Sequence, residues 1–128
     1  MMLVQAGSVS RTKLLLELKG KGTCECELAR HLAPLTVGSL LRGIPVEGRA
    51  HRLEDKFVYF ETGLTIGNEK QRTSFKRGEL AFMIANGSIC IFLKDASAPG
   101  LNPIGKVTSN LELIESSAPG DVLLLRTS

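Results

Sequence analysis

Three cysteines are the residues whose type and spacing most directly suggest chemistry. Cys24 and Cys26 are separated by one residue, and their thiolates, with Cys90 as a third, can bind a soft metal ion. No fourth Cys or His has the spacing of a structural zinc site, and all three cysteines lie in apolar or alternating stretches that are typical of small core residues. We therefore expect buried, reduced thiols, and we predict no metal and no cofactor.

Other catalytic and nucleic-acid-binding patterns are incomplete. The histidines, His31 and His51, have no nearby serine in a nucleophile-elbow sequence, so no hydrolytic triad is predicted. The glycines of segment 63–67 lack the lysine of a phosphate-binding loop. The basic run 70–77 contains one aromatic residue, Phe75, which favours a solvated loop over a platform for single-stranded nucleic acid.

Composition predicts one soluble domain. The chain has 128 residues, of which 43% are hydrophobic, and a net charge of +3. This length suffices for a single core, and the weak positive charge falls short of the basic surface that nucleic-acid binding requires. No apolar run reaches the ~20 residues of a membrane span, and residues 1–10 lack the pattern of a signal peptide. We expect a cytoplasmic protein with a loose tail at 1–10, one domain at 11–128, and neither nucleic acid nor membrane as a partner; the sequence does not indicate the oligomeric state.

The first half of the chain contains two predicted hairpins and a helix. Residues 13–19 and 23–28 each alternate between apolar and polar side chains, and the glycines between them turn the chain. A helix is expected over 34–43, because proline suits a first helical turn and apolar residues follow at helical spacing. Segments 46–53 and 57–60 flank a polar turn and predict the second hairpin.

The second half is organised around two short apolar runs. Residues 80–84 and 89–93 flank an Asn-Gly step, which marks a tight turn, so they predict a hairpin buried on both faces. A short strand is expected near 64–66 and a last strand at 122–125. The capping-box pattern at 109–112 predicts the start of a short helix. Many short strands with few helical stretches favour a small β-barrel or a sandwich.

The central stretch resembles cyclophilins. Asn86-Gly87-Ser88, then Ile91-Phe92, then Ile104-Gly105-Lys106-Val107 have the order and spacing of the loop and strands that precede a short helix in that family. His51-Arg52, followed by Phe57, resembles its H-R-x-x-x-x-F stretch. The plan of the chain is most similar to the small prokaryotic cyclophilin-like proteins of unassigned function. This resemblance implies a mainly β fold, a small closed cyclophilin-like β-barrel with two short capping helices.

The resemblance also implies roles for two residues. In cyclophilins the arginine of this stretch donates hydrogen bonds to the substrate and the phenylalanine forms the floor of the proline pocket, and these roles fall on Arg52 and Phe57. Rotation about an X–Pro bond breaks amide resonance, and a fixed guanidinium can stabilise the twisted state by hydrogen bonding. The resemblance therefore implies peptidyl-prolyl cis-trans isomerase activity, with Arg52 as the catalytic residue.

The sequence departs from the family at several groove positions. Phe60 and Ile89 stand where the family has glutamine, Ile91 replaces an aromatic residue, and the chain has no tryptophan. We therefore expect a binding module for a peptide or small molecule, and the alternative is a weak isomerase. A role in carboxyltransferases or amidases rests on fold analogy alone. The segment 96–103 is expected to be a loop that either forms a rim of the groove or only connects two strands. The predicted groove is lined by Arg52, Phe57, Phe60, Met83, Asn86, Ile91 and Phe92.

Overall fold

Alternating leucines build the first hairpin, as predicted. In the computed structural model, which describes residues 10–128, β1 (Arg11–Leu18) and β2 (Gly22–Ala29) pair antiparallel along their whole lengths. The leucines at the even positions of β1 are buried, and the side chains between them face outward or are half-buried. Of the tail expected at 1–10, all but Ser10 lies outside the described residues.

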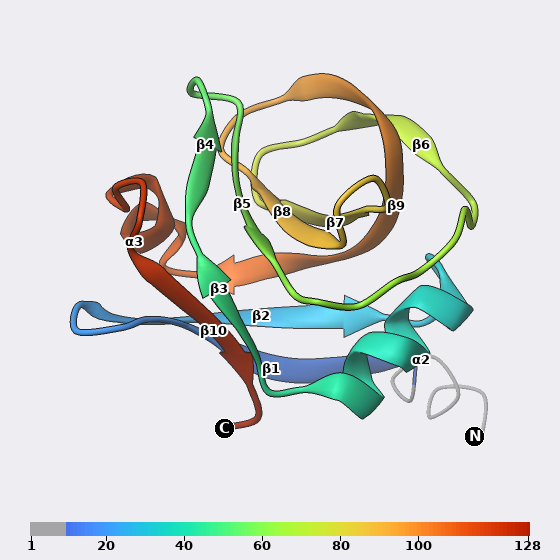
Figure 1. The fold of residues 1–128 in the computed structure, drawn as a ribbon, viewed down its shortest axis with the longest axis horizontal. Coiled ribbons are helices and arrows are strands. Elements are labelled where there is room, and N and C mark those ends of the chain that lie inside the picture. Colours follow the sequence, from blue (N-terminus) through green and yellow to red (C-terminus); the bar gives the residue numbers. More distant parts are fainter. Residues whose placement is uncertain (1–9) are drawn as a thin grey trace, which may run out of the picture.

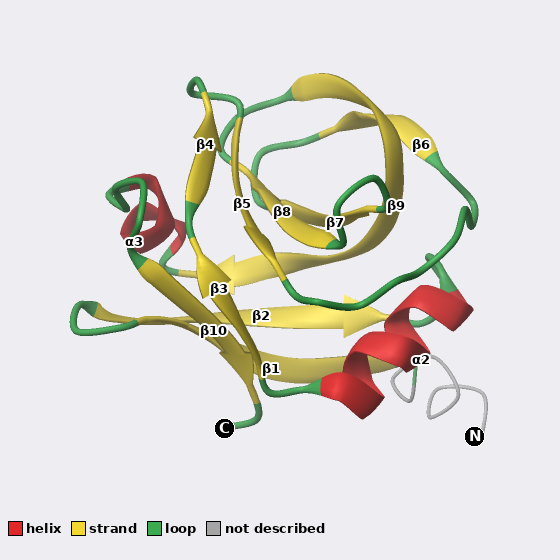
Figure 2. Cartoon of the chain, in the orientation of Figure 1, coloured by secondary structure: helices red, strands yellow, loops and turns green. Residues whose placement is uncertain are grey.

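The described chain forms one antiparallel sheet of ten strands that curls on itself (Figure 1). Its order is β3-β10-β1-β2-β9-β7-β8-β5-β4, and β6 pairs with β9 outside this path. Strands dominate residues 10–128, and the two helices of that part of the chain flank the sheet (Figure 2). No helix within residues 10–128 is both long and apolar enough to cross a membrane. The other elements are α2 (Pro34–Gly43), β3 (Val46–Arg49), β4 (His51–Leu53), β5 (Phe57–Glu61), β6 (Arg72–Phe75), β7 (Glu79–Met83), β8 (Ser88–Phe92), β9 (Ala96–Ser109), α3 (Leu111–Glu115) and β10 (Val122–Arg126).

The two end strands of the sheet are neighbours in the sequence. β3 and β4 are separated only by Ala50, yet β3 pairs with β10 while β4 pairs with β5. Among the described residues, hydrogen bonds do not join β3 to β4, so they do not close the sheet into the predicted barrel. The backbones still approach closely at this seam: a Cβ atom on Gly48 would lie 2.3 Å from the carbonyl oxygen of Glu61. Only glycine fits there without a backbone shift.

Apolar side chains are buried on both faces of the central strands, as their nearly unbroken apolar sequences predict. On β8, Ile89 and Ile91 face the inner core, whereas Cys90 and Phe92 belong to a second cluster on the opposite face. The inner core lies inside the curled sheet and receives Leu40 of α2 and Ile114 of α3. β6 and the first half of β9 contribute to the second cluster from the other side. Its buried members are Phe57, Phe75, Ala81, Cys90, Phe92 and Leu101.

Residues 96–103 are not a loop, and this prediction was wrong. They form the first half of β9, which pairs with β6 through Ser97 and Ser74 and with β7 through Leu101 and Met83. The register shifts within both pairings, and such bulges accommodate the proline and glycine residues that suggested a loop. Leu101 is 0% exposed and packs in the second cluster, which also contains Phe57.

Three smaller predictions also differ from the structure. The segment 46–53 divides, and only its second part pairs with β5. Residues 64–66 form no strand. The predicted capping box is absent, because α3 begins after Asn110, which has a left-handed φ of 62° and no side-chain capping hydrogen bond. Asn110 Nδ2 instead donates to the carbonyl oxygen of Thr23 at 3.0 Å, which ties the helix start to β2.

A polar network anchors the long connection between β5 and β6. The Glu69 carboxylate accepts hydrogen bonds from the backbone amides of Leu35 (2.9 Å) and Thr36 (2.8 Å) and from the Thr36 hydroxyl (2.8 Å). Asn102 of β9 accepts from the Glu69 amide at 3.0 Å and donates to Thr36 Oγ1 at 3.0 Å and to the Gly67 carbonyl at 2.9 Å. Glu69 thus supplies acceptors to the first turn of α2, which has no side-chain cap of its own.

This arrangement makes stability depend on pH. Burial alone would raise the pKa of Glu69, but the hydrogen bonds from Leu35 and Thr36 outweigh it and hold this pKa below its ordinary value of 4.5. Because the folded-state pKa is the lower one, the stabilisation is complete above pH 4.5 and is lost as the pH falls through the folded-state value. We expect the difference in unfolding free energy between wild type and Glu69→Gln to shrink as urea denaturation is repeated from pH 7 downward. The exposed Glu25→Gln is the control, and a difference that is independent of pH would contradict the assignment.

Candidate functional site

Arg52, the predicted catalytic residue, is engaged by the protein itself. It lies on β4 and is half-buried, and its Nη1 donates to the carbonyl oxygens of Glu115 at 3.2 Å and Ser117 at 3.0 Å. These carbonyls stand at the end of α3, where helical carbonyl groups lack intrahelical partners. The observed role of this guanidinium is therefore to join β4 to the end of α3.

The apolar residues of the predicted groove divide between the two faces of the sheet. Phe60 and Ile91 are buried in the inner core. Phe57, which is 2% exposed, and Phe92 are buried in the second cluster, with Met83 half-buried against it. The alternation of side chains along β5 and β8 explains this division, because neighbouring residues of a strand point to opposite faces.

Asn86, the remaining groove residue, is exposed in the turn between β7 and β8. The structure therefore brings together Phe57, Phe92 and Met83 on one face, and it places Arg52, Asn86 and the inner-core pair elsewhere.

A row of aromatic rings crosses the face that holds Phe57. His51 stacks on Tyr59 with 5.2 Å between ring centroids, and Tyr59 lies 5.9 Å from Phe57. Phe57 lies 5.1 Å from Phe92, which stacks on Phe75 at 4.7 Å. This aromatic row starts at the exposed His51 and runs into the buried second cluster, so three strands and β6 are linked by ring contacts.

The aromatic row ends at Phe75, whose ring contacts the guanidinium group of Arg72, and both residues line a pocket. Arg72 places its Cζ 4.8 Å from the centroid of the Phe75 ring, and its Nη2 lies 3.1 Å from Glu79 Oε1. Its Nε is buried and has no hydrogen-bond partner among residues 10–128. The adjoining cavity, the Arg72 pocket, has a volume of about 440 Å³ and is lined by Arg72, Ser74, Phe75, Lys76, Glu79, Asp95, Ala96 and Ser97.

The carboxylates of the Arg72 pocket are fixed by backbone amides. Glu79 Oε1 accepts from the Lys76 amide at 2.8 Å, and Asp95 Oδ1 accepts from the Arg77 amide at 2.9 Å. With Arg72 and Lys76 the pocket carries equal numbers of positive and negative groups. It can therefore present hydrogen-bond donors and acceptors together without selecting a strongly charged ligand.

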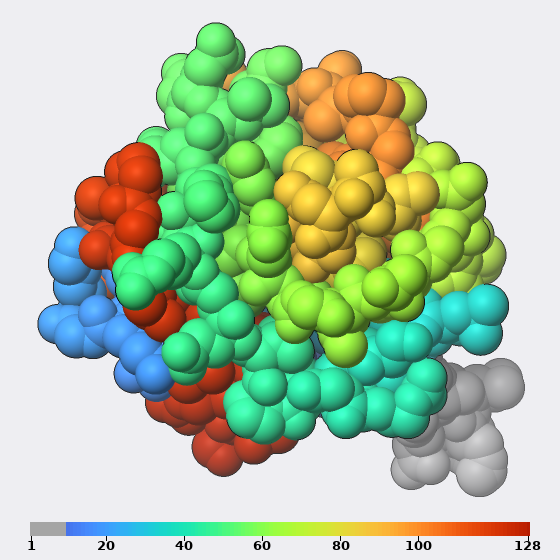
Figure 3. All heavy atoms as spheres, viewed as in Figure 1, coloured from blue at the N-terminus to red at the C-terminus, as the bar shows by residue number. Residues whose placement is uncertain are grey.

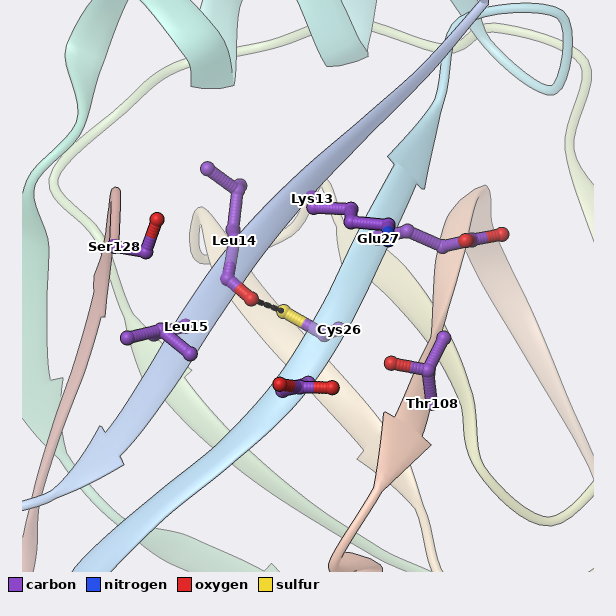
Figure 4. A pocket seen from close by; sticks show the side chains of 8 residues that line it. Lys13, Leu14, Leu15, Cys26, Glu27, Thr108 and Ser128 are labelled. Atoms are coloured by element: carbon purple, nitrogen blue, oxygen red, sulfur yellow. Dashed lines mark hydrogen bonds between the residues drawn. The ribbon is translucent and has the colours of Figure 1, made fainter. Parts of the chain in front are cut away.

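A second cavity, of about 370 Å³, lies at β1, β2 and β9 (Figure 4). Lys13 and Glu27 oppose each other across the β1–β2 pair, and Thr108 lies on the neighbouring strand. Beneath them the Cys26 thiol donates to the Leu14 carbonyl at 3.7 Å. Glu27 is paired with Arg11 at 2.8 Å, so the acidic group on this side of the cavity already has a cationic partner.

The three cysteines are buried, and they divide between the two hydrophobic clusters. Cys24 and Cys26 face the inner core from β2, and Cys90 lies in the second cluster. Residues 10–128 contain no group of three or more His, Cys, Asp or Glu side chains that could hold a metal ion. Burial raises the pKa of Cys24 to about 11 and that of Cys26 to about 12, and it also raises the pKa of Cys90.

We expect these thiols to be unreactive in the folded protein. Because thiolates are the nucleophiles, pKa values this high should slow the reaction with Ellman's reagent at pH 8 by about two orders of magnitude relative to the unfolded chain. The measurement compares reagent consumption with and without 6 M guanidinium chloride. Rapid release of one equivalent from the native protein would contradict the buried positions.

Sequence analysis missed the residues that extend the row beyond Phe57. Phe75 was interpreted as part of a solvated basic loop, although it is buried on β6. Arg72 belonged to the same run, and its partner Glu79 is distant enough in sequence to give no local signal. Tyr59 could have been found, because it lies two residues after Phe57 and therefore on the same face of β5.

Comparisons with known proteins agree with the fold. The family model described as cyclophilin-like matches residues 12–126. The solution structure of a hypothetical protein from Archaeoglobus fulgidus has a TM-score of 0.78 and 24% identity, and the match covers 93% of this chain and 96% of that one. That likeness concerns the fold alone. No curated protein matches the sequence. Because the family model spans nearly all of the described residues, the chain belongs to the cyclophilin-like family.

Proposed function

We propose that this protein is a binding module for an extended peptide segment, with the Arg72 pocket as its site. The observation that carries the proposal is the pocket itself, in which a guanidinium, an aromatic ring and two amide-bound carboxylates surround about 440 Å³. Cavities of roughly 300–1,000 Å³ that combine apolar surface with a few fixed polar groups are typical ligand sites.

A peptide suits this pocket better than an ion does. Each peptide unit carries one donor and one acceptor, and the pocket offers Arg72 as donor and Glu79 and Asp95 as acceptors. Among the described strands, β6 pairs only with β9, so its other edge can take up an extended segment by strand addition. The Phe75 ring and Ala96 provide the apolar contact for a side chain of the ligand.

Two observations favour the Arg72 pocket over the groove that the resemblance implied. Phe57, which would form the floor of a proline pocket, is covered within the second cluster, where Phe92 and Phe75 stack on each other. Arg52 donates to backbone carbonyls rather than toward Phe57. We therefore propose that the ligand binds at the end of the aromatic row. The experiment described next also tests for prolyl isomerase activity.

The test is an amide chemical-shift titration with a panel of extended hexapeptides, half of which contain proline. Shifts should concentrate at β6, at the 94–97 segment and around Glu79. Arg72→Gln should weaken binding by about tenfold, because it removes a charge-assisted hydrogen bond. Lys21→Gln, in the β1–β2 turn, is the matched control.

Three outcomes would overturn the proposal. Shifts centred on Phe57 and Arg52 would place the site in the groove, and exchange between cis and trans X–Pro peptides that Arg52→Ala abolishes would make the protein an isomerase. The absence of any saturable shift at β6 with the whole panel would reject the pocket.

A further inference from the structure

A glycine in the middle of α2 is covered by two arginine side chains. Gly38 lies inside the helix, where glycine is less favourable than alanine, and it is nevertheless buried. A Cβ atom at this position would lie 3.3 Å from Arg42 Nη1 and 3.5 Å from Arg30 Nη1. Both guanidinium groups therefore reach within 3.5 Å of one point on the helix surface. The two guanidinium groups therefore lie over the backbone of Gly38, where no side chain separates them from the helix.

The converging cations have no acidic partner. Within residues 10–128, no carboxylate forms an ion pair with Arg30 or Arg42, whereas seven other Lys and Arg side chains have such a partner. The first nine residues of the sequence contain no Asp or Glu. Arg42 Nη2 contacts the Ser39 hydroxyl at 3.3 Å, which is a second polar group at the same place. Two like charges held together repel each other, and an anion between them would remove this repulsion.

We propose that Arg30, Arg42 and Ser39 form a binding site for a phosphate group over Gly38. Two guanidinium forks can each bind two oxygens of a tetrahedral anion, and the doubly charged form of phosphate matches two cations. The Ser39 hydroxyl can donate to one of the same oxygens, because each oxygen can accept more than one hydrogen bond. The same chemistry would accept free phosphate or the phosphate group of a larger ligand. The site is independent of the Arg72 pocket, because it shares no residue with it.

The experiment is an amide-detected titration of the whole chain with inorganic phosphate at constant ionic strength, with chloride as the reference anion. Phosphate should produce saturable shifts at Gly38, Ser39 and Arg42. Arg30→Gln and Arg42→Gln should each weaken binding by about tenfold, since each removes charge-assisted hydrogen bonds. Lys13→Gln is the control, because it removes one exposed cation that has no ion-pair partner among residues 10–128 and should leave the affinity unchanged.

Gly38→Ala separates a binding role from a structural one. Its methyl group would take the position on which the guanidinium groups converge, so phosphate affinity should fall while the improved helix propensity raises the urea midpoint. Repeating the titration with a phosphorylated sugar then distinguishes free phosphate from a larger ligand. Shifts that grow linearly without saturation, that chloride reproduces, or that survive the Arg30→Gln and Arg42→Gln double variant would overturn the proposal.

Discussion

Gly105→Ala is expected to remove most of the folding stability. A Cβ atom at Gly105 would lie 1.9 Å from the carbonyl oxygen of Glu27 and 3.0 Å from the Cα of Leu28. These atoms belong to the backbone of β2, so rotation of a side chain cannot relieve the clash. The pairing of Leu28 with Gly105 would have to open, and with it the junction of β2 and β9 in the centre of the sheet order. We expect a loss of about 4 kcal/mol or more, the range reserved for severe core defects.

Urea denaturation followed by circular dichroism measures this loss. Gly67→Ala is the matched control, because it makes the same chemical change where no atom lies within 4 Å of the new methyl group and where φ is not positive. That variant should be neutral or more stable by up to about 1 kcal/mol, through the entropy of the unfolded chain. If Gly105→Ala unfolds within about 1 kcal/mol of wild type, the close approach of β9 to β2 is wrong.

Asn102→Ala is expected to cost about 3 kcal/mol, the second-largest effect, because it removes one partner each from the buried Thr36 hydroxyl and from two part-buried backbone groups. The Asn102 side chain is fully buried, and it binds the Glu69 amide, the Thr36 hydroxyl and the Gly67 carbonyl. Its removal would also loosen the Glu69 carboxylate from the first turn of α2. The free energy of unfolding in urea is the measurement.

Two further variants test this assignment. Asn68→Ala makes the same change at an exposed position of the connection between β5 and β6, beside Glu69, and should be close to neutral. A double variant with Glu69→Gln should lose less than the sum of the single losses, because both residues act in one network. Strict additivity would show that Asn102 and Glu69 stabilise the protein separately.

Short-range patterns were sufficient to predict the hairpins. β1 and β2 alternate clearly and are joined by a glycine turn, and β7 and β8 flank Gly87, whose φ of 69° suits a tight turn. In each pair the turn and both strands lie within one short segment, so local chemistry determines the partner. The helix at Pro34 was predictable for the same reason.

The first half of β9, residues 96–103, could not be predicted as a strand, because pairing with distant segments outweighs the local preference of its turn-forming residues. Pro99, Gly100 and Pro103 favour a loop locally, yet β6, β7 and β2 all pair with this strand. Bulges in these pairings accommodate residues that a regular ladder would exclude. The strands that pair with β9 come from three separate segments, so the sequence of β9 itself does not reveal its pairing.

The candidate site was only partly predictable for a related reason. The motif of Arg52 and Phe57 correctly indicated a strand, a turn and a strand, but the contacts of Arg52 with the end of α3 depend on residues far along the chain. Phe75 sits among cations and looks exposed until β6 folds onto the second cluster. Whether such a side chain is buried, and against which face of the sheet, is decided only when distant strands pair.

The position of β10 has a consequence for how the protein forms in a cell. β10 lies between β1 and β3, and Leu15 pairs with Arg126, so nearly the whole chain separates these partners. In Figure 3 the red spheres of the last part of the chain, which includes β10, lie next to the blue spheres of the first hairpin and to green spheres of the segment that contains β3. A nascent chain still threaded in the ribosome cannot complete this pairing, and β1 and β3 keep open edges until β10 emerges. Contacts this remote also slow folding, so the interval before β10 has paired is when a chaperone would most reduce aggregation.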